Sequence, residues 1–137
     1  MKSNELIAAY SKNPANKYKM ENPSIAYIED NRICSDQVEV FLKIENNTLT
    51  DFSFEGYMSI VATACVAITG EILVEEKTSI EDILKLDESF VHKNIGTDIS
   101  PRRRFAAMIG VLAIKNAVRA WQGDDYREDF SDIEVAL

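Results

Sequence analysis

Residues 34–56 read CSDQVEVFLKIENNTLTDFSFEG, and this stretch decides the fold. From Val38 to Ile44, apolar and polar side chains alternate well enough to predict a strand with one covered face. Residues 45–48 are rich in asparagine and predict a turn, because asparagine tolerates a left-handed backbone. The alternation resumes over residues 49–54, so the whole stretch predicts a β-hairpin.

One more strand and a series of helices complete the expected α+β domain. Residues 25–29 predict a strand that extends the hairpin to a three-stranded antiparallel meander. Residues 60–74 are apolar on nearly every side and predict a buried helix with Ser59 as its N-cap. Further helices are expected from Ser79 and, as the last long helix, from Pro101. Strands followed by helices predict that the helices pack on one face of the sheet.

The domain boundary is expected near the end of the last long helix. The chain has 137 residues, 46% of them apolar, which suits a single compact domain. We assign residues 1–122 to this domain and residues 123–137 to an acidic C-terminal tail. The tail carries isolated apolar side chains, so a docked extra helix and a flexible peptide both remain open.

Composition excludes several classes of function. A net charge of -8 and a pI of about 4.7 argue against nucleic acid as a partner. The short basic run 102–104 is either a solvated helix start or a contact for an acidic partner. Two widely spaced cysteines, Cys34 and Cys65, indicate a reducing compartment. No apolar run is long enough to cross a bilayer, so we predict a cytoplasmic protein without a membrane partner.

A cysteine and an aspartate stand two residues apart in the loop before the hairpin. The thiolate of Cys34 and the carboxylate of Asp36 can face one point, and together they suit a borderline-soft metal. Two ligands do not complete a site. The other cysteine, Cys65, lies within the predicted buried helix of residues 60–74. Cys65 is expected to be a small buried apolar residue.

The order of the motifs resembles the scaffold family for iron–sulfur cluster assembly, which includes the NifU N-terminal domain and IscU-like and SufU-like proteins. Cys34-Ser35-Asp36 stands where this family has Cys-Gly-Asp, and residues 49–56 are close to its I-x-D-x-x-F-x-G motif. A long helix follows, then residues 78–82 (TSIED), which are similar to the family's G-K-S-x-x-E, and an Arg-rich start to the final helix completes the family order. The resemblance extends from about residue 5 to residue 121.

The resemblance implies a metal site of three cysteines and one aspartate at one end of the domain. By position, Cys34 is the first cysteine and Asp36 is the aspartate. The second cysteine is replaced by Ser59, which is at best a weak metal ligand. The third position falls on Ala106 or on Phe105, and neither side chain is a ligand.

Three hypotheses about function follow from the resemblance and from this loss of ligands. The first is a scaffold-like protein that handles iron, another metal or sulfur through Cys34 and Asp36. The second is a degenerate paralogue that acts as an adaptor or regulator of cluster assembly without binding a cluster. The third is a small-molecule binding module on the same fold. The sequence shows no catalytic constellation, so we predict a protein that is not an enzyme.

The resemblance also implies what the chain would bind. The alternatives for its cargo are an iron–sulfur cluster, a single iron or zinc ion, or no metal at all, because two thiolates are missing. The expected partners are a cysteine desulfurase or other cluster-assembly proteins. A second copy of the chain, as a homodimer, is the remaining candidate.

Overall fold

The structure, a computed structural model, describes residues 2–31 and 35–136. Its single sheet has three antiparallel strands in the order β1-β2-β3: β1 (Ile25–Asn31), β2 (Asp36–Glu45) and β3 (Thr48–Tyr57). The predicted meander is therefore confirmed. Asn46 and Asn47 form the turn between β2 and β3, both with positive φ, as the sequence predicted from asparagine's tolerance of this backbone.

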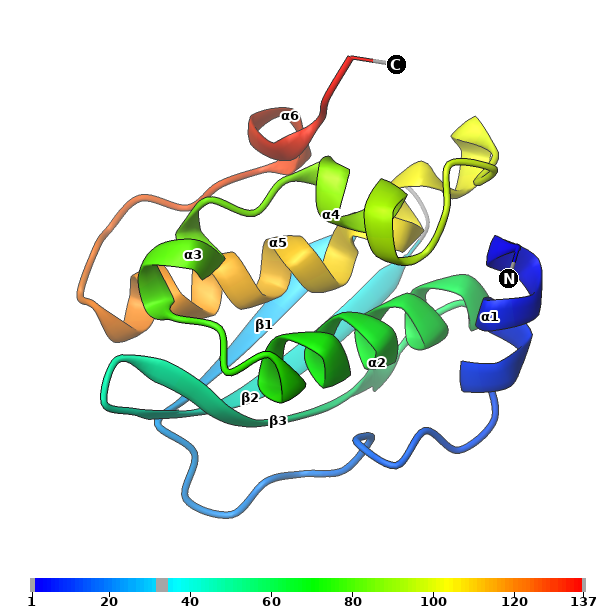
Figure 1. The fold of residues 1–137 in the computed structure, drawn as a ribbon. Helices are drawn as coiled ribbons and strands as arrows, with labels where there is room; N and C mark the ends of the chain where they lie inside the picture. Colours follow the sequence, from blue (N-terminus) through cyan, green and yellow to red (C-terminus); the bar gives the residue numbers. More distant parts are fainter. Residues whose placement is uncertain (1, 32–34, 137) are drawn as a thin grey trace.

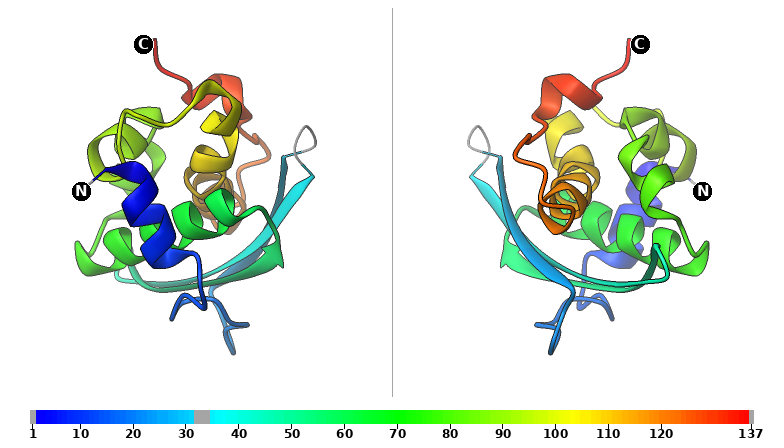
Figure 2. Two further views of the ribbon diagram at one scale, coloured as in Figure 1. Left: turned by 90° about the vertical axis from the view of Figure 1, so that its right-hand side faces the viewer. Right: turned by 90° about the vertical axis from the view of Figure 1, so that its left-hand side faces the viewer.

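Six α-helices and one 3₁₀ turn are found in the described part of the chain. They are α1 (Ser3–Tyr10), α2 (Ile60–Glu75), α3 (Ile80–Leu84), α4 (Glu88–Asn94), the 3₁₀ turn η1 (Pro101–Arg103), α5 (Arg104–Trp121) and α6 (Phe130–Ile133). The long helices α2 and α5 lie on one face of the sheet (Figure 1). Figure 2 shows the sheet as a curved layer around these helices, with the segment between α1 and β1 on its other side. Among the described helices, none has the length and apolar character that a bilayer span requires.

The core lies between the sheet and the two long helices. Its side chains come from the inward faces of β2 and β3 and from the buried sides of α2 and α5, and they include Val38, Leu42, Phe54, Leu73, Met108 and Leu112. Helix α2 is buried nearly all round, as its apolar sequence predicted. Fully burying one such side chain stabilises the fold by about 1.5–3 kcal/mol.

Two glycines allow backbones to approach closely in this core. A Cβ at Gly56, whose φ is +150°, would lie 2.1 Å from the Gln37 carbonyl oxygen across the β2–β3 pair. A Cβ at Gly110 would lie 3.0 Å from the Val66 Cα, where α5 meets α2. Larger residues would push the hairpin strands or the two helices apart.

The C-terminal segment packs against α5. The Asn116 side chain accepts from the backbone N–H of Glu128 at 2.8 Å and donates to its carbonyl at 3.0 Å. The Glu128 carboxylate lies 2.9 Å from Lys115 Nζ and 2.9 Å from Arg119 Nε. Ile133 is fully buried. Of the two alternatives for the tail, the structure therefore has the docked one, whereas the domain boundary at residue 122 stays a prediction.

Candidate functional site

The starts of β2, α2 and α5 meet at one end of the molecule (Figure 1). Asp36 opens β2, Ser59 is the residue before α2, and Phe105 and Ala106 lie in the first turn of α5. Four of the five predicted site positions therefore gather at this end. The fifth, Cys34, lies outside the described residues.

Asp36 is the most constrained of these residues. Its side chain is 2% exposed, and its Oδ1 accepts a hydrogen bond from the backbone N–H of Ser59 at 2.8 Å. A carboxylate at this place is stabilised by the positive end of the α2 dipole. Its other oxygen, Oδ2, is buried and has no hydrogen-bond partner in the described part of the structure. Asp36 thus holds the helix start with one oxygen, and no described residue bonds the other.

Ser35 sets the direction in which the chain enters β2. Its φ is +58°, in the left-handed region that favours glycine. In the Cys-Gly-Asp motif that residues 34–36 resemble, this position is a glycine. Ser35 therefore adopts a backbone conformation that is unfavourable for a residue with a Cβ.

Asn31 is a site residue that the sequence did not predict. It is 2% exposed and lies directly opposite Asp36 in the β1–β2 register, so both side chains are on the same face of the sheet. Directly opposed Cβ atoms are about 5 Å apart. Asn31 Nδ2 also has no hydrogen-bond partner in the described ranges. Only the strand register could reveal this pair, since nothing in the local sequence marks Asn31.

Ser59 acts as the N-cap that the sequence predicted. Its Oγ accepts from the backbone N–H of Ala62 at 3.1 Å, and its side chain is exposed. A capped serine hydroxyl is neutral at ordinary pH, in contrast to a thiolate. The structure therefore gives Ser59 a clear structural role at the site.

The start of α5 offers no metal ligand. Ala106 is 5% exposed, and Phe105 stacks on Phe130 of α6 with ring centroids 4.4 Å apart and planes 8° from parallel. The C-terminal segment therefore covers the corner that holds the third cysteine in the family pattern. The sequence could not predict this stack, because the two rings are far apart in the chain.

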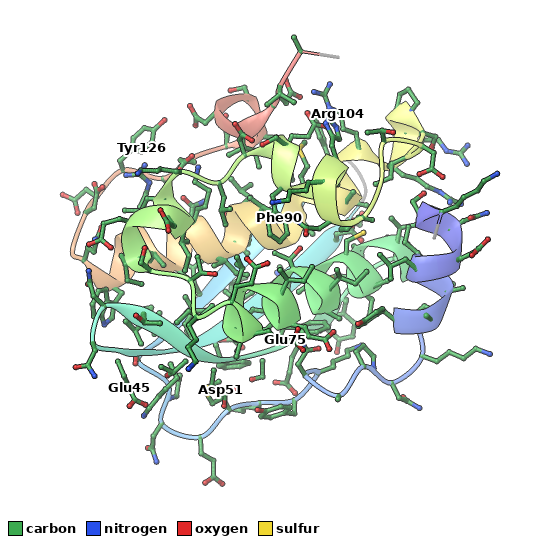
Figure 3. All side chains as sticks on the ribbon, viewed as in Figure 1. Glu45, Asp51, Glu75, Phe90, Arg104 and Tyr126 are labelled. Carbon is green, nitrogen blue, oxygen red and sulfur yellow. The ribbon has the colours of Figure 1, made fainter. Side chains whose placement is uncertain are left out.

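A buried carboxylate fixes the C-terminal segment beside this corner. Glu88, 3% exposed, accepts from Arg104 Nε at 2.6 Å and from the backbone N–H of Val135 at 3.0 Å. Arg104 also donates to the Val135 carbonyl at 2.9 Å, and Figure 3 places Arg104 where α5 meets the C-terminal segment. The hydrogen bonds from Arg104 lower the pKa of Glu88 below its ordinary value.

Cys65 lies within α2 and is fully buried. Burial raises the pKa of its thiol to about 12, so it carries no thiolate near neutral pH. This agrees with the prediction that Cys65 is a packing residue.

The described side chains where β2, α2 and α5 begin do not supply the ligands of a complete metal centre. Over residues 2–31 and 35–136, no three His, Cys, Asp or Glu side chains gather as a metal-binding group. An iron–sulfur cluster takes several thiolates, and neither Ser59 nor Ala106 provides one. The described residues supply one carboxylate oxygen, on Asp36, with a buried amide beside it.

The sequence matches the model of a known protein family. The family model described as the NifU-like N terminal domain matches residues 2–128. A comparison with curated proteins finds no match in sequence.

Solved structures share the fold at low sequence identity. A nitrogen-fixing NifU-like protein (N-terminal) from Brucella abortus is 14% identical, with a TM-score of 0.70 over 88% of this chain and 94% of that one. A protein from Fervidobacterium islandicum AW-1, described as a candidate iron–sulfur cluster assembly scaffold for the SUF system, is 19% identical. Its TM-score is also 0.70, over 83% of this chain and 94% of that one. At these identities the likeness establishes the α+β fold.

Proposed function

Because this chain belongs to the family of NifU-like N-terminal domains, we propose that it is a scaffold-like protein of iron–sulfur cluster assembly. In this proposal it handles iron or sulfur through Cys34 and Asp36, with an incomplete set of ligands. It acts by holding its cargo and presenting it to other proteins, and not as an enzyme.

The observation that supports this proposal most directly is that no described residue bonds the buried Oδ2 of Asp36. A buried carboxylate oxygen without a partner is costly, and native proteins rarely keep one without a reason. Asp36 stands two residues from Cys34 in the family spacing. A thiolate and a carboxylate from this segment would provide two of the four positions that iron or zinc takes.

The missing positions argue against a complete cluster on one chain. Ser59 and Ala106 replace two cysteines, and Phe105 is stacked against Phe130. We therefore propose a single iron or zinc ion as the cargo. Its remaining ligands come from solvent, from a second copy of the chain or from a partner. Sulfur acceptance by Cys34 from a cysteine desulfurase is the other form of cargo that this residue set allows.

Anaerobic metal titration tests this proposal. We expect the purified protein to bind Fe²⁺ or Zn²⁺, and Cys34→Ala and Asp36→Asn to weaken the affinity by about tenfold or more. Cys65→Ser and Asp51→Asn are matched controls, since Cys65 is buried in α2 and Asp51 is exposed and accepts a hydrogen bond from the backbone N–H of Phe52. If the two control substitutions weaken metal affinity as much as the site substitutions do, the proposal is wrong.

A second function, that of an adaptor without cargo, is favoured by one observation. The docked α6 and the Phe105–Phe130 stack close the corner where a third ligand would be. An adaptor would form a complex with a cysteine desulfurase whose affinity is unchanged by Cys34→Ala. If this chain binds the desulfurase in this way but takes up neither metal nor sulfur, it acts as an adaptor. Metal uptake that depends on Cys34 excludes the adaptor function.

A further inference from the structure

We propose that the outer face of the sheet, at the end where β2 begins, is a docking surface for a basic segment of a partner protein that also carries an aliphatic or aromatic side chain. We call this surface the outer acidic face and define it by Asp30, Ile28, Gln37, Glu39, Glu55 and Tyr57. The inference rests on strand register, exposure and charge. It holds whether or not Asp36 binds a metal.

The strand register arranges this face in two rows across all three strands. One row is Ile28, Glu39 and Glu55, because Glu39 pairs with Ile28 on β1 and with Glu55 on β3. The next row, nearer the start of β2, is Asp30, Gln37 and Tyr57. Directly paired residues share a face of the sheet, so these side chains form one continuous patch.

The patch exposes two large apolar side chains beside a hollow. Tyr57 is 84% exposed and Ile28 is 53% exposed. Both line a hollow of about 580 Å³, whose other wall includes Lys17. Exposed apolar side chains rimmed by polar ones are typical of sites where another protein binds. Because most of the Tyr57 side chain is exposed, it contributes little to the stability of the fold. It can bury much of this apolar surface in a complex.

Among the described residues, no ion pair balances the negative charges of the patch. Glu39 and Glu55 lie directly opposite each other, and like charges in this arrangement destabilise a sheet. No ion pair involves Asp30, Glu39 or Glu55 in the described part of the structure. Of the residues that the structure describes, Lys17 is the one basic side chain lining the hollow. A partner that brings arginine or lysine to this patch would relieve the repulsion between the two glutamates.

The same charges exclude other occupants. Two copies of this face would repel each other, and nucleic acid or an anionic membrane would be repelled as well. A basic segment with an apolar side chain matches both features: its cations meet Glu39 and Glu55, and its apolar group contacts Ile28 or Tyr57. Gln37 directly follows Asp36, so a segment docked here sits next to the candidate site.

Fluorescence anisotropy with a labelled synthetic peptide tests the inference. The probe is a twelve-residue peptide in which arginine alternates with leucine, and a peptide with serine in place of leucine is its counterpart. We expect the full-length protein to bind the first peptide more tightly, with an affinity that falls as salt is added. The double variant Glu39→Lys/Glu55→Lys should lose at least about tenfold in affinity, and Tyr57→Ser several-fold.

Matched controls separate docking from general attraction to an acidic protein. Glu76→Lys/Asp125→Lys changes the net charge by the same amount at two exposed sites elsewhere, and Tyr18→Ser removes another exposed tyrosine. The controls should stay within about twofold of the wild type. The neutral pair Glu39→Gln/Glu55→Gln repeats the test if the lysine pair fails to fold. Equal losses in face and control variants, or no preference for the leucine peptide, would overturn the inference. Metal titration of the same variants reads out the proposed cargo function separately.

Discussion

The backbone N–H of Ser59 donates to Asp36 Oδ1 at 2.8 Å, so the first residue of β2 holds the first turn of α2. The two residues are 23 positions apart, with the whole hairpin between them. This bond fixes the buried helix relative to the sheet at the end where the candidate site lies. It also orients the carboxylate, whose second oxygen stays without a partner in the described residues.

Removal of the Asp36 carboxylate should weaken the fold as well as the site. Hydrogen bonds to charged groups contribute about 1.5–3 kcal/mol, so we expect Asp36→Ala to lower the free energy of unfolding by about 2 kcal/mol. Urea denaturation measures this loss. Asp125→Ala, at an exposed position, is the control and should change stability by less than about 0.5 kcal/mol. A stability equal to that of the wild type would show that the Ser59 bond is not formed in solution.

Ser35→Gly should stabilise the protein. Ser35 has a φ of +58°, which costs a residue with a Cβ about 1–2 kcal/mol and costs glycine nothing. Glycine also gives the unfolded chain more conformational freedom, which offsets part of this benefit. We therefore expect the free energy of unfolding, measured by urea denaturation, to rise by about 0.5–1 kcal/mol. The matched control is Ser131→Gly in α6, a helical position where glycine should destabilise. Loss of stability in Ser35→Gly would contradict the left-handed turn.

The Glu88–Arg104 pair should make the fold sensitive to acid. The pKa of Glu88 is lowered in the folded protein, so its ionised form stabilises the fold above the ordinary value of 4.5. That contribution is lost as the pH falls through the lowered pKa. We expect Glu88→Gln to be less stable than the wild type by about 1.5 kcal/mol at pH 7, and the two proteins to converge in acid. Urea denaturation across this pH range measures both, with Glu76→Gln as the exposed control. A difference that does not change with pH would rule out the ionised pair.

Cys65 should be chemically inert in the folded protein. Burial raises the pKa of its thiol to about 12 and also denies reagents access. In the Cys34→Ala variant Cys65 is the remaining cysteine, so thiol titration with a chromogenic disulfide at pH 8 reports on it alone. We expect no rapid reaction until denaturant is added. Prompt reaction in the native state would mean that α2 opens readily.

Restoring the two missing cysteines should restore cluster binding. The double variant Ser59→Cys/Ala106→Cys adds thiols at the starts of α2 and α5, where the family pattern has them. After anaerobic incubation with iron and sulfide, we expect this variant to develop visible absorption that the wild type lacks. Cys34→Ala in the same background should abolish it. Ser59→Cys/Phe105→Cys decides between the two alternatives for the third position. Absorption in neither double variant would mean that this end of the fold no longer accepts a cluster.

The sequence predicted the secondary structure because its signals are local. Alternating side chains predicted the hairpin over residues 38–54, and the apolar run predicted the buried helix α2. The caps at Ser59 and Ser79 were predicted from residue type, and each serine accepts the expected backbone hydrogen bond. Each of these features depends on residues within a few positions of one another.

The arrangement of the site depended on contacts between distant segments. Asp36 was predicted as a site residue, but its bond to Ser59 and its neighbour Asn31 follow from the packing of β1, β2 and α2. The stack of Phe105 on Phe130 likewise required the C-terminal segment to dock on α5. The sequence left open whether this segment docks, because burial of its few apolar residues has to outweigh the entropy of ordering it.

The sequence by itself thus determined the α+β meander and its caps, since residue identity and short-range periodicity specify both. Only the tertiary structure decided which polar atoms are buried without partners and which carboxylates face one another. Within residues 2–31 and 35–136, Asp36 Oδ2 is left without a partner where β1, β2 and α2 pack together, and Glu39 lies opposite Glu55 because of the strand register. A shift of one residue in that register would turn every side chain to the other face of the sheet, so this information exists only once the strands have paired.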